Sequence, residues 1–169
     1  MQFFNRLLIS VIILYTGCFP GHKNYSAAIS KDGEEILYGP VTAEQLFLHY
    51  AEWKETHDIY QPQTEVLSEL KPDPELAVEI FFGTWCGDSQ REVPRFLKII
   101  HLSQLVNNTR MQLYAVDRDK KLESGLTTIR NIEKVATFIF YRSGYEIGRI
   151  IEYPDRTLEE DIKRIVELK

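Results

Sequence analysis

The sequence has 169 residues, of which 44% are hydrophobic and 27% are charged, and its formal net charge is −5. This length and composition suit one ordinary folded domain with an appended segment, and they exclude a chain that is disordered throughout. No cluster of lysine and arginine stands out from the acidic background, which argues against nucleic acid as a partner.

The first residues have the features of an export signal. Residues 7–14 form an apolar run behind the single cation Arg6, too short to cross the ~30 Å hydrocarbon layer but of secretory length. The run ends in LYTGC, residues 14–18, which resembles a bacterial lipobox. This resemblance implies removal of residues 1–17 and acylation of Cys18, and hence an exported lipoprotein of the bacterial cell envelope, anchored in a membrane and facing the periplasm. A plain signal peptide or an uncleaved anchor is the alternative.

A linker and a helical extension are expected next. Residues 18–30 mix proline, glycine and polar residues without periodicity, as an anchor and linker would. Residues 31–74 are expected to be a helical N-terminal extension, with one helix that starts at a capping box on Thr42 and a shorter one over 64–70. The inward positions of the first helix follow at helical spacing: Leu46, Tyr50, Trp53 and His57.

An α/β domain is expected over residues 75–169. Its elements in chain order are a strand (76–82), a helix (89–105), a strand (111–116), a short helix (126–133), a hairpin (137–141 and 146–151) and a helix that starts at a capping box on Thr157. A helix that joins two parallel strands crosses over in the right-handed sense. The expected architecture is therefore a central mixed sheet of four or five strands flanked by helices.

Cys86 is the candidate nucleophile of this domain. It follows the first strand directly, where the next helix begins, and the free N–H groups and positive dipole end of a helix favour a thiolate. If Cys18 carries lipid, Cys86 is the remaining thiol and no internal disulfide can form. The charged run 117–121 follows the second parallel strand, so it should lie on the same rim of the sheet as Cys86. It is expected to be solvated loop surface.

The neighbours of the thiol have expected roles. Trp85 would shield one side of the sulfur, and Gly87 would let the backbone of a partner approach. Ser89, one helical turn on, could donate a hydrogen bond to the thiolate. Asp88 would disfavour a second negative charge nearby, with Arg91 as a possible offset.

These residues carry a resemblance to a known family. The segment FGTWCGDS, residues 82–89, together with Pro94 eight residues beyond Cys86, resembles the active-site turn and helix-kinking proline of thioredoxins. The resemblance covers residues 76–169. It implies a thioredoxin-like fold, Cys86 as nucleophile, and thiol–disulfide exchange with protein thiols, protein disulfides or small thiols.

Three departures from the family pattern stand beside the match. Ser89 replaces the resolving cysteine, so an outside thiol must release any mixed disulfide. Ile80 stands where many members have a buried acid, and strand alternation sends Glu79 to the opposite face. Val135-Ala136-Thr137 resembles the segment that carries a cis-proline facing the sulfur, and Ala136 replaces that proline. Because a cis bond before a non-proline residue costs ~2.5–4 kcal/mol, the Val135–Ala136 bond is expected to be trans, with the loop rearranged.

Two functions remain open at this point. The leading hypothesis is an envelope-anchored, single-cysteine thioredoxin-like protein in which Cys86 and Ser89 carry the chemistry. In that hypothesis Trp85, Gly87 and Asp88 form the active-site turn, and the 135–137 loop forms part of the partner groove. The alternative is a redox-inactive thioredoxin-fold interaction module held at the membrane. No cofactor is expected, and no metal either, because no histidine or second cysteine accompanies Cys86 in the sequence.

Overall fold

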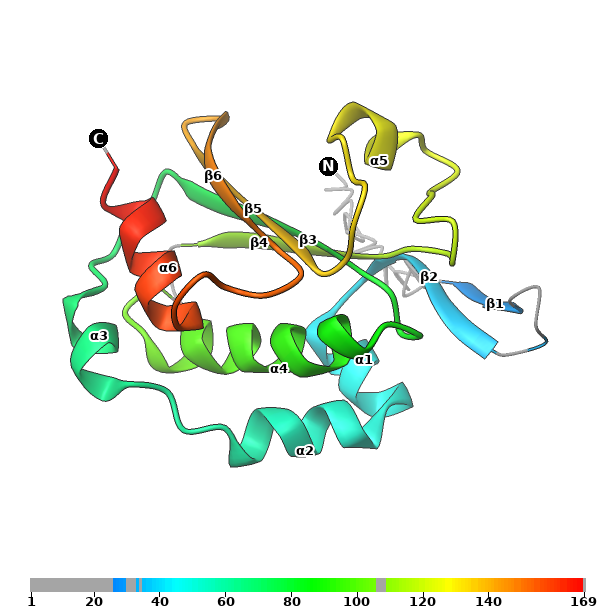
Figure 1. Ribbon diagram of the computed structural model, residues 1–169, viewed down its shortest axis with the longest axis horizontal. Helices are drawn as coiled ribbons and strands as arrows, with labels where there is room; N and C mark the ends of the chain where they lie inside the picture. The colour runs from blue at the N-terminus through cyan, green and yellow to red at the C-terminus, as the bar shows by residue number, and fades with distance from the viewer. Residues whose placement is uncertain (1–25, 30–32, 34, 106–108, 169) are drawn as a thin grey trace, which may run out of the picture.

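A computed structural model describes residues 26–29, 33, 35–105 and 109–168 (Figure 1). Its strands are β1 (Ser26–Ile29), β2 (Glu35–Val41), β3 (Leu76–Phe82), β4 (Arg110–Ala115), β5 (Thr137–Arg142) and β6 (Tyr145–Ile151). Its helices are α1 (Ala43–His49), α2 (Ala51–Ile59), α3 (Thr64–Glu69), α4 (Gly87–Leu102), α5 (Leu126–Ile129) and α6 (Leu158–Val166).

The strands form one mixed sheet in the order β1-β2-β4-β3-β5-β6. The β3–β4 pair is parallel and every other neighbouring pair is antiparallel. The five strands from β2 to β6, with helices packed on them, confirm the predicted thioredoxin-like α/β fold, and β1 adds a further strand at the β2 edge.

Strands β1 and β2 occupy a region that was expected to be linker and helical extension. β2 pairs with β4 through Gly39–Val41, and its Leu37 and Val41 are buried in the main core. The sequence pattern hid this strand because Gly39 and Pro40 interrupt it, and both residue types usually weaken or end strands. The division of the chain at residue 74 stays a prediction, but the segment before it supplies part of the sheet.

The helices lie mainly on one side of the sheet (Figure 1). α4 and α6 pack on that face, α2 lies along the outer side of α4, and α3 contacts α6. The single helix expected from Thr42 onward is two helices, because Tyr50 leaves the helical region at φ −129° and ψ 88°. The capping box on Thr42 is present, as is the one on Thr157.

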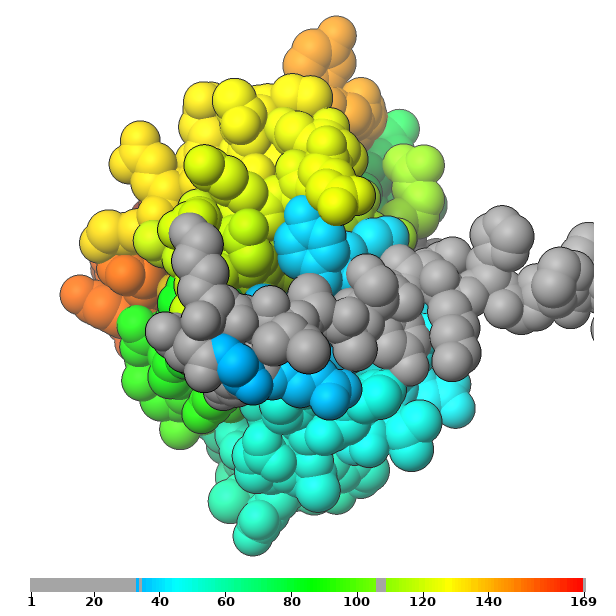
Figure 2. Space-filling view, turned by 90° about the vertical axis from the view of Figure 1, so that its right-hand side faces the viewer, coloured from blue at the N-terminus to red at the C-terminus, as the bar shows by residue number. Residues whose placement is uncertain are grey.

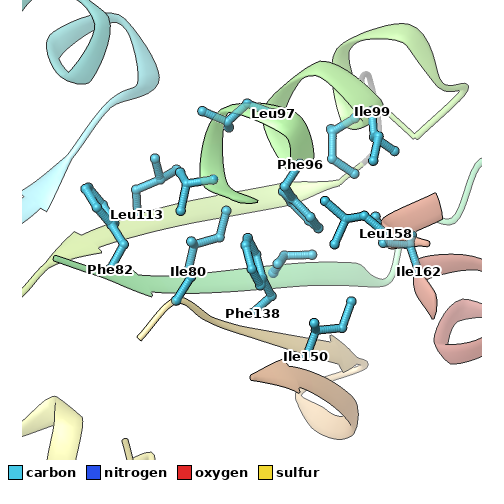
Figure 3. Close-up of a cluster of buried hydrophobic side chains, with 14 of the residues drawn as sticks. Ile80, Phe82, Phe96, Leu97, Ile99, Leu113, Phe138, Ile150, Leu158 and Ile162 are labelled. Atoms are coloured by element: carbon cyan, nitrogen blue, oxygen red, sulfur yellow. The ribbon is translucent and has the colours of Figure 1, made fainter. Parts of the chain in front are cut away.

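The main core lies between α4, α6 and the sheet (Figure 3). Phe96 of α4 stacks on Phe138 of β5 with ring centroids 4.8 Å apart, and Ile162 of α6 is fully buried beside them. The extension joins this core through Trp53, which is fully buried and contacts Phe82 at 5.5 Å between centroids.

A second, smaller core lies on the opposite face of the sheet. It consists of Phe81, Val116, Leu122, Ile132, Val135 and Ile139. The segment between β4 and β5, which includes α5, covers this face at the end where β3 and β4 finish. Figure 2 shows that segment, in yellow-green and yellow, above the cyan helices α1 and α2. Trp85 and Cys86 pack against the edge of this second core.

No helix in the described part of the chain is both long and apolar enough to cross a bilayer. Residues 1–17 and Cys18 lie outside the described residues, so the signal peptide and the lipidated cysteine stay predictions.

Candidate functional site

Cys86 lies between the end of β3 and the start of α4. It is the N-cap residue of α4, with extended backbone angles (φ −102°, ψ 123°), and its side chain is half-buried. Its N–H donates to the carbonyl of Gly83 at 3.0 Å, and its own carbonyl accepts from the N–H of Gln90 at 2.9 Å. This tight turn holds the sulfur where the first N–H groups of α4 have no partner within the helix.

The sulfur of Cys86 contacts the loop before β5. Its Sγ lies 3.2 Å from the carbonyl oxygen of Val135, close enough for the thiol to donate a hydrogen bond. The expected juxtaposition of Cys86 with the 135–137 loop is therefore present in the structure. Ala136 and Thr137, the other two residues of that loop, are buried.

The expected trans peptide bond between Val135 and Ala136 was wrong: the bond is cis. The expected trans bond rested on the local preference of an isolated peptide, whereas hydrogen bonds at Ala136 and Thr137 hold this loop in the folded protein. The carbonyl of Ala136 accepts from the N–H of Glu152 at 2.6 Å, and Thr137 Oγ1 donates to the carbonyl of Lys134 at 2.7 Å. Because the bond is cis, the loop rearrangement that was expected from a trans bond is also wrong.

Trp85 folds back over the turn. Its Nε1 donates to the carbonyl of Val116, just beyond β4, at 3.2 Å. A Cβ placed on Gly83 would lie 2.5 Å from the indole, so only glycine leaves room for this packing. The guanidinium of Arg118 lies 5.6 Å from the Trp85 ring, which places the charged run after β4 on the same rim as Cys86. Trp85 thus links the ends of the two parallel strands beside the thiol.

Ser89 has a different position from the one expected. Its side chain is fully buried, and its Oγ accepts a hydrogen bond from the N–H of Gly83 at 3.2 Å. Among the hydrogen bonds of the described residues, the partner of the Cys86 sulfur is Val135 and not Ser89. Ser89 therefore stabilises the turn that carries the thiol. The expected hydrogen bond between Ser89 and the sulfur of Cys86 is not formed.

Asp88 and Gly87 occupy the exposed side of the turn. Asp88 accepts a hydrogen bond from Arg91 at 2.7 Å, so the expected offset of its charge is present. Hydrogen bonds to Glu92 and then to Asp88 raise the pKa of Arg91, which keeps this guanidinium charged. Gly87 is exposed, and a Cβ there would meet nothing within 4 Å, so a partner has room to approach.

In the part of the chain that the structure describes, neither Ile80 nor Glu79 takes the place of the missing buried acid. Ile80 is fully buried in the main core, and Glu79 lies on the other face, where it accepts from Arg130 at 2.6 Å and from the Tyr141 hydroxyl at 2.9 Å. Burial and the hydrogen bond to Glu79 raise the pKa of Tyr141. The strand-alternation argument for Glu79 is confirmed.

Comparisons with known proteins show which family this fold belongs to. No protein-family profile matches the sequence. The chain is 31% identical over 104 residues to a Dictyostelium discoideum protein named thioredoxin-5, a match over 62% of this chain and 93% of that protein. The chain belongs to the thioredoxin family. It is also 27% identical over 101 residues to Thioredoxin H9 of Arabidopsis thaliana, over 60% of this chain and 67% of that protein.

A solved structure supports the fold of this thioredoxin. A Pseudomonas aeruginosa protein of unknown function is similar with a TM-score of 0.51 at 15% identity, over 75% of this chain and 86% of that one. Thioredoxin-like proteins in general carry out thiol–disulfide redox chemistry on protein thiols and disulfides. Cys86 is the free cysteine of the described residues in this thioredoxin.

An ion pair beside the site was missed by sequence reasoning. Lys134 Nζ lies 2.6 Å from Glu152 Oε2, and the two residues flank the loop whose carbonyl contacts Cys86. Glu152 has a positive φ of 63°, an uncommon conformation for a residue other than glycine. The hydrogen bond to Glu152 raises the pKa of Lys134, and the charge of Asp88 contributes in the same direction. Glu152 lies 18 positions after Lys134 in the chain, so no local pattern could have indicated the pair.

Proposed function

We propose that this thioredoxin is a monothiol exchange protein, anchored at the bacterial envelope, in which Cys86 forms mixed disulfides that an external thiol resolves. The observation that carries the proposal is the position of Cys86 Sγ: half-buried, at the N-cap of α4, and 3.2 Å from Val135 O. Membership of the thioredoxin family supplies the class of chemistry.

In the first step, the Cys86 thiolate attacks one sulfur of a partner's disulfide. A bond forms between Cys86 and that sulfur, the partner's S–S bond breaks, and the other partner sulfur leaves as a thiolate that takes up a proton. In the second step, an external thiol, as its thiolate, attacks the partner sulfur of the mixed disulfide. The new disulfide joins the external thiol to the partner, and Cys86 leaves and regains a proton.

The surrounding residues have supporting roles. A helix start favours negative charge because its first N–H groups have no partner within the helix, and Cys86 lies at this end of α4. Ser89 acts as a positioning residue, since its Oγ holds Gly83 in the turn. Trp85 and the 135–137 loop border the sulfur, and the open space at Gly87 admits the partner.

The anchor is a separate part of the proposal. Cys18, acylated after cleavage of residues 1–17, would hold the protein at the membrane facing the periplasm, where exported proteins with disulfides are found. Expression in a bacterial host with a radiolabelled fatty acid tests this. Label should appear on the wild-type protein and on Cys86→Ser but not on Cys18→Ser, and equal labelling of Cys18→Ser would refute the anchor.

A redox-inactive interaction module is the second candidate. Two observations favour it. Ser89, which stands in place of a resolving cysteine, is fully buried, and Ile80 stands where a buried acid would lie beneath the site. Against it stands the position of Cys86 at the N-cap of α4, since a scaffold has no need of a thiol at a helix start.

Partner capture separates the two candidates. Wild type and Cys86→Ser, each also carrying Cys18→Ser, are incubated with exported proteins that contain disulfides, and adducts are separated without reductant. The exchange proposal expects adducts with wild-type Cys86 only, and these should disappear on addition of an external thiol. Capture that is unchanged in Cys86→Ser supports the interaction module and overturns the exchange proposal.

A further inference from the structure

A groove runs beside the loop that contacts the thiol. Its volume is about 430 Å³, and its lining includes both residues of the Lys134–Glu152 ion pair. Thr137, the last residue of the 135–137 loop, also lines it. Val135 contacts Cys86 Sγ and lies next to Lys134 of the groove in the chain. When a peptide is joined to Cys86, those of its side chains that lie near the reacting cysteine can therefore reach the groove.

The groove is acidic. Three carboxylates line it, those of Glu133, Glu152 and Asp155, against the single ammonium of Lys134. Lys134 already pairs with Glu152 at 2.6 Å. Asp155 has Arg164 at 3.3 Å, and that guanidinium is shared with another carboxylate.

Glu133 is the groove's uncompensated charge. Its side chain is exposed, and it has no ion pair among those of the described residues. A cation in the groove would therefore meet a carboxylate without displacing an existing pair, whereas an anion would meet surplus negative charge.

Apolar surface lies next to these carboxylates. Tyr153 is 61% exposed and Ile151 is 44% exposed, and both line the groove. Lysine and arginine side chains suit such a place, because their methylene stems cover apolar surface while the charged head reaches a carboxylate.

We infer that this groove selects partners in which a lysine or arginine lies a few residues from the reacting cysteine. The inference rests on the proposed exchange function and specifies its partner class: a basic segment of a disulfide-containing protein. Small anionic thiols are disfavoured as direct partners, because the groove offers them no free cation.

Three synthetic peptides test the inference. Each carries one cysteine as a mixed disulfide with an aromatic thiol, followed by two lysines, two glutamines or two glutamates. The full chain with Cys18→Ser reacts with each at low and high salt, and the released aromatic thiol gives the rate. Each rate is divided by that of a small neutral thiol with the same peptide, which removes differences in intrinsic reactivity.

The lysine peptide should react about fivefold faster than the glutamine peptide at low salt, the glutamate peptide should be slowest, and high salt should shrink the differences. Glu133→Gln should reduce the preference, and Glu133→Lys should abolish or reverse it. Glu55→Gln removes an equal charge from the exposed face of α2 and should leave the preference unchanged.

The outcomes distinguish the two levels of the proposal. Equal rates for the three peptides, a faster glutamate peptide, or a preference that survives Glu133→Lys would overturn the groove inference while leaving Cys86 exchange intact. Absence of any Cys86-dependent product with all three peptides would overturn the proposed function itself.

Discussion

The thiol of Cys86 and the carbonyl oxygen of Val135 face each other at 3.2 Å. This contact suits the protonated sulfur, which can donate to the carbonyl, whereas a thiolate has no proton to donate and would be repelled by the oxygen. The start of α4 has the opposite preference and favours the anion. A partner that reacts with this sulfur can approach over Gly87, where an added Cβ would meet nothing within 4 Å.

Gly83→Ala should displace Trp85. The new Cβ would lie 2.5 Å from the indole, so the ring must move and lose its hydrogen bond to Val116. Trp85 fluorescence should then become more accessible to a soluble quencher, while the fully buried Trp53 contributes little to the change. Gly87→Ala is the matched control, because nothing lies within 4 Å of its Cβ. The same quenching in both variants would show that Gly83 has no such role.

Trp53→Ala should destabilise the whole domain. The side chain is fully buried against Phe82 of β3, and removing such a residue costs about 3–5 kcal/mol of unfolding free energy. Denaturant unfolding measures this loss. Leu48→Ala, at a 79% exposed position of the neighbouring helix α1, should change stability by no more than about 0.5 kcal/mol. Similar small losses in both variants would mean that the extension is not part of the folding unit.

Alkaline pH should destabilise the fold through two tyrosines. Burial and hydrogen bonds to Glu159 and Glu79 raise the pKa values of Tyr60 and Tyr141 above the ordinary value of 10.0. Above about pH 10 the unfolded chain then loses tyrosine protons that the folded protein keeps, so stability is full below this pH and falls as pH rises. The double variant Tyr60→Phe/Tyr141→Phe should show a shallower fall, by denaturant titration between pH 9 and 11. An equally steep fall in the variant would contradict this assignment.

The elements with strong local signals were predicted well. β3 was expected over 76–82 and occupies those residues, because its apolar run has no breaker. The capping box on Thr157 marked the start of α6 for the same kind of local reason, since the cap and its partner Glu160 are three residues apart. The parallel pairing of β3 and β4 followed from the helix between them.

The features that were missed depend on tertiary contacts. β2 was hidden by Gly39 and Pro40, and its place in the sheet comes from pairing with β4, more than 70 residues away. Ser89 was expected to contact the sulfur from its spacing alone, yet its hydroxyl faces Gly83 in the interior. The negative charge of the groove comes from residues that precede and follow the β5–β6 hairpin. No single segment of the sequence contains all of these residues, so the groove could not be predicted from a local pattern.

The central claim is that Cys86 is an accessible nucleophile favoured by the start of α4. The most direct measurement is its rate of reaction with a small neutral disulfide at pH 7, in the Cys18→Ser chain, folded and in denaturant. The account predicts a faster reaction in the folded protein than in the unfolded chain, and no product with Cys86→Ser. A folded thiol that reacts more slowly than the unfolded one would contradict the account.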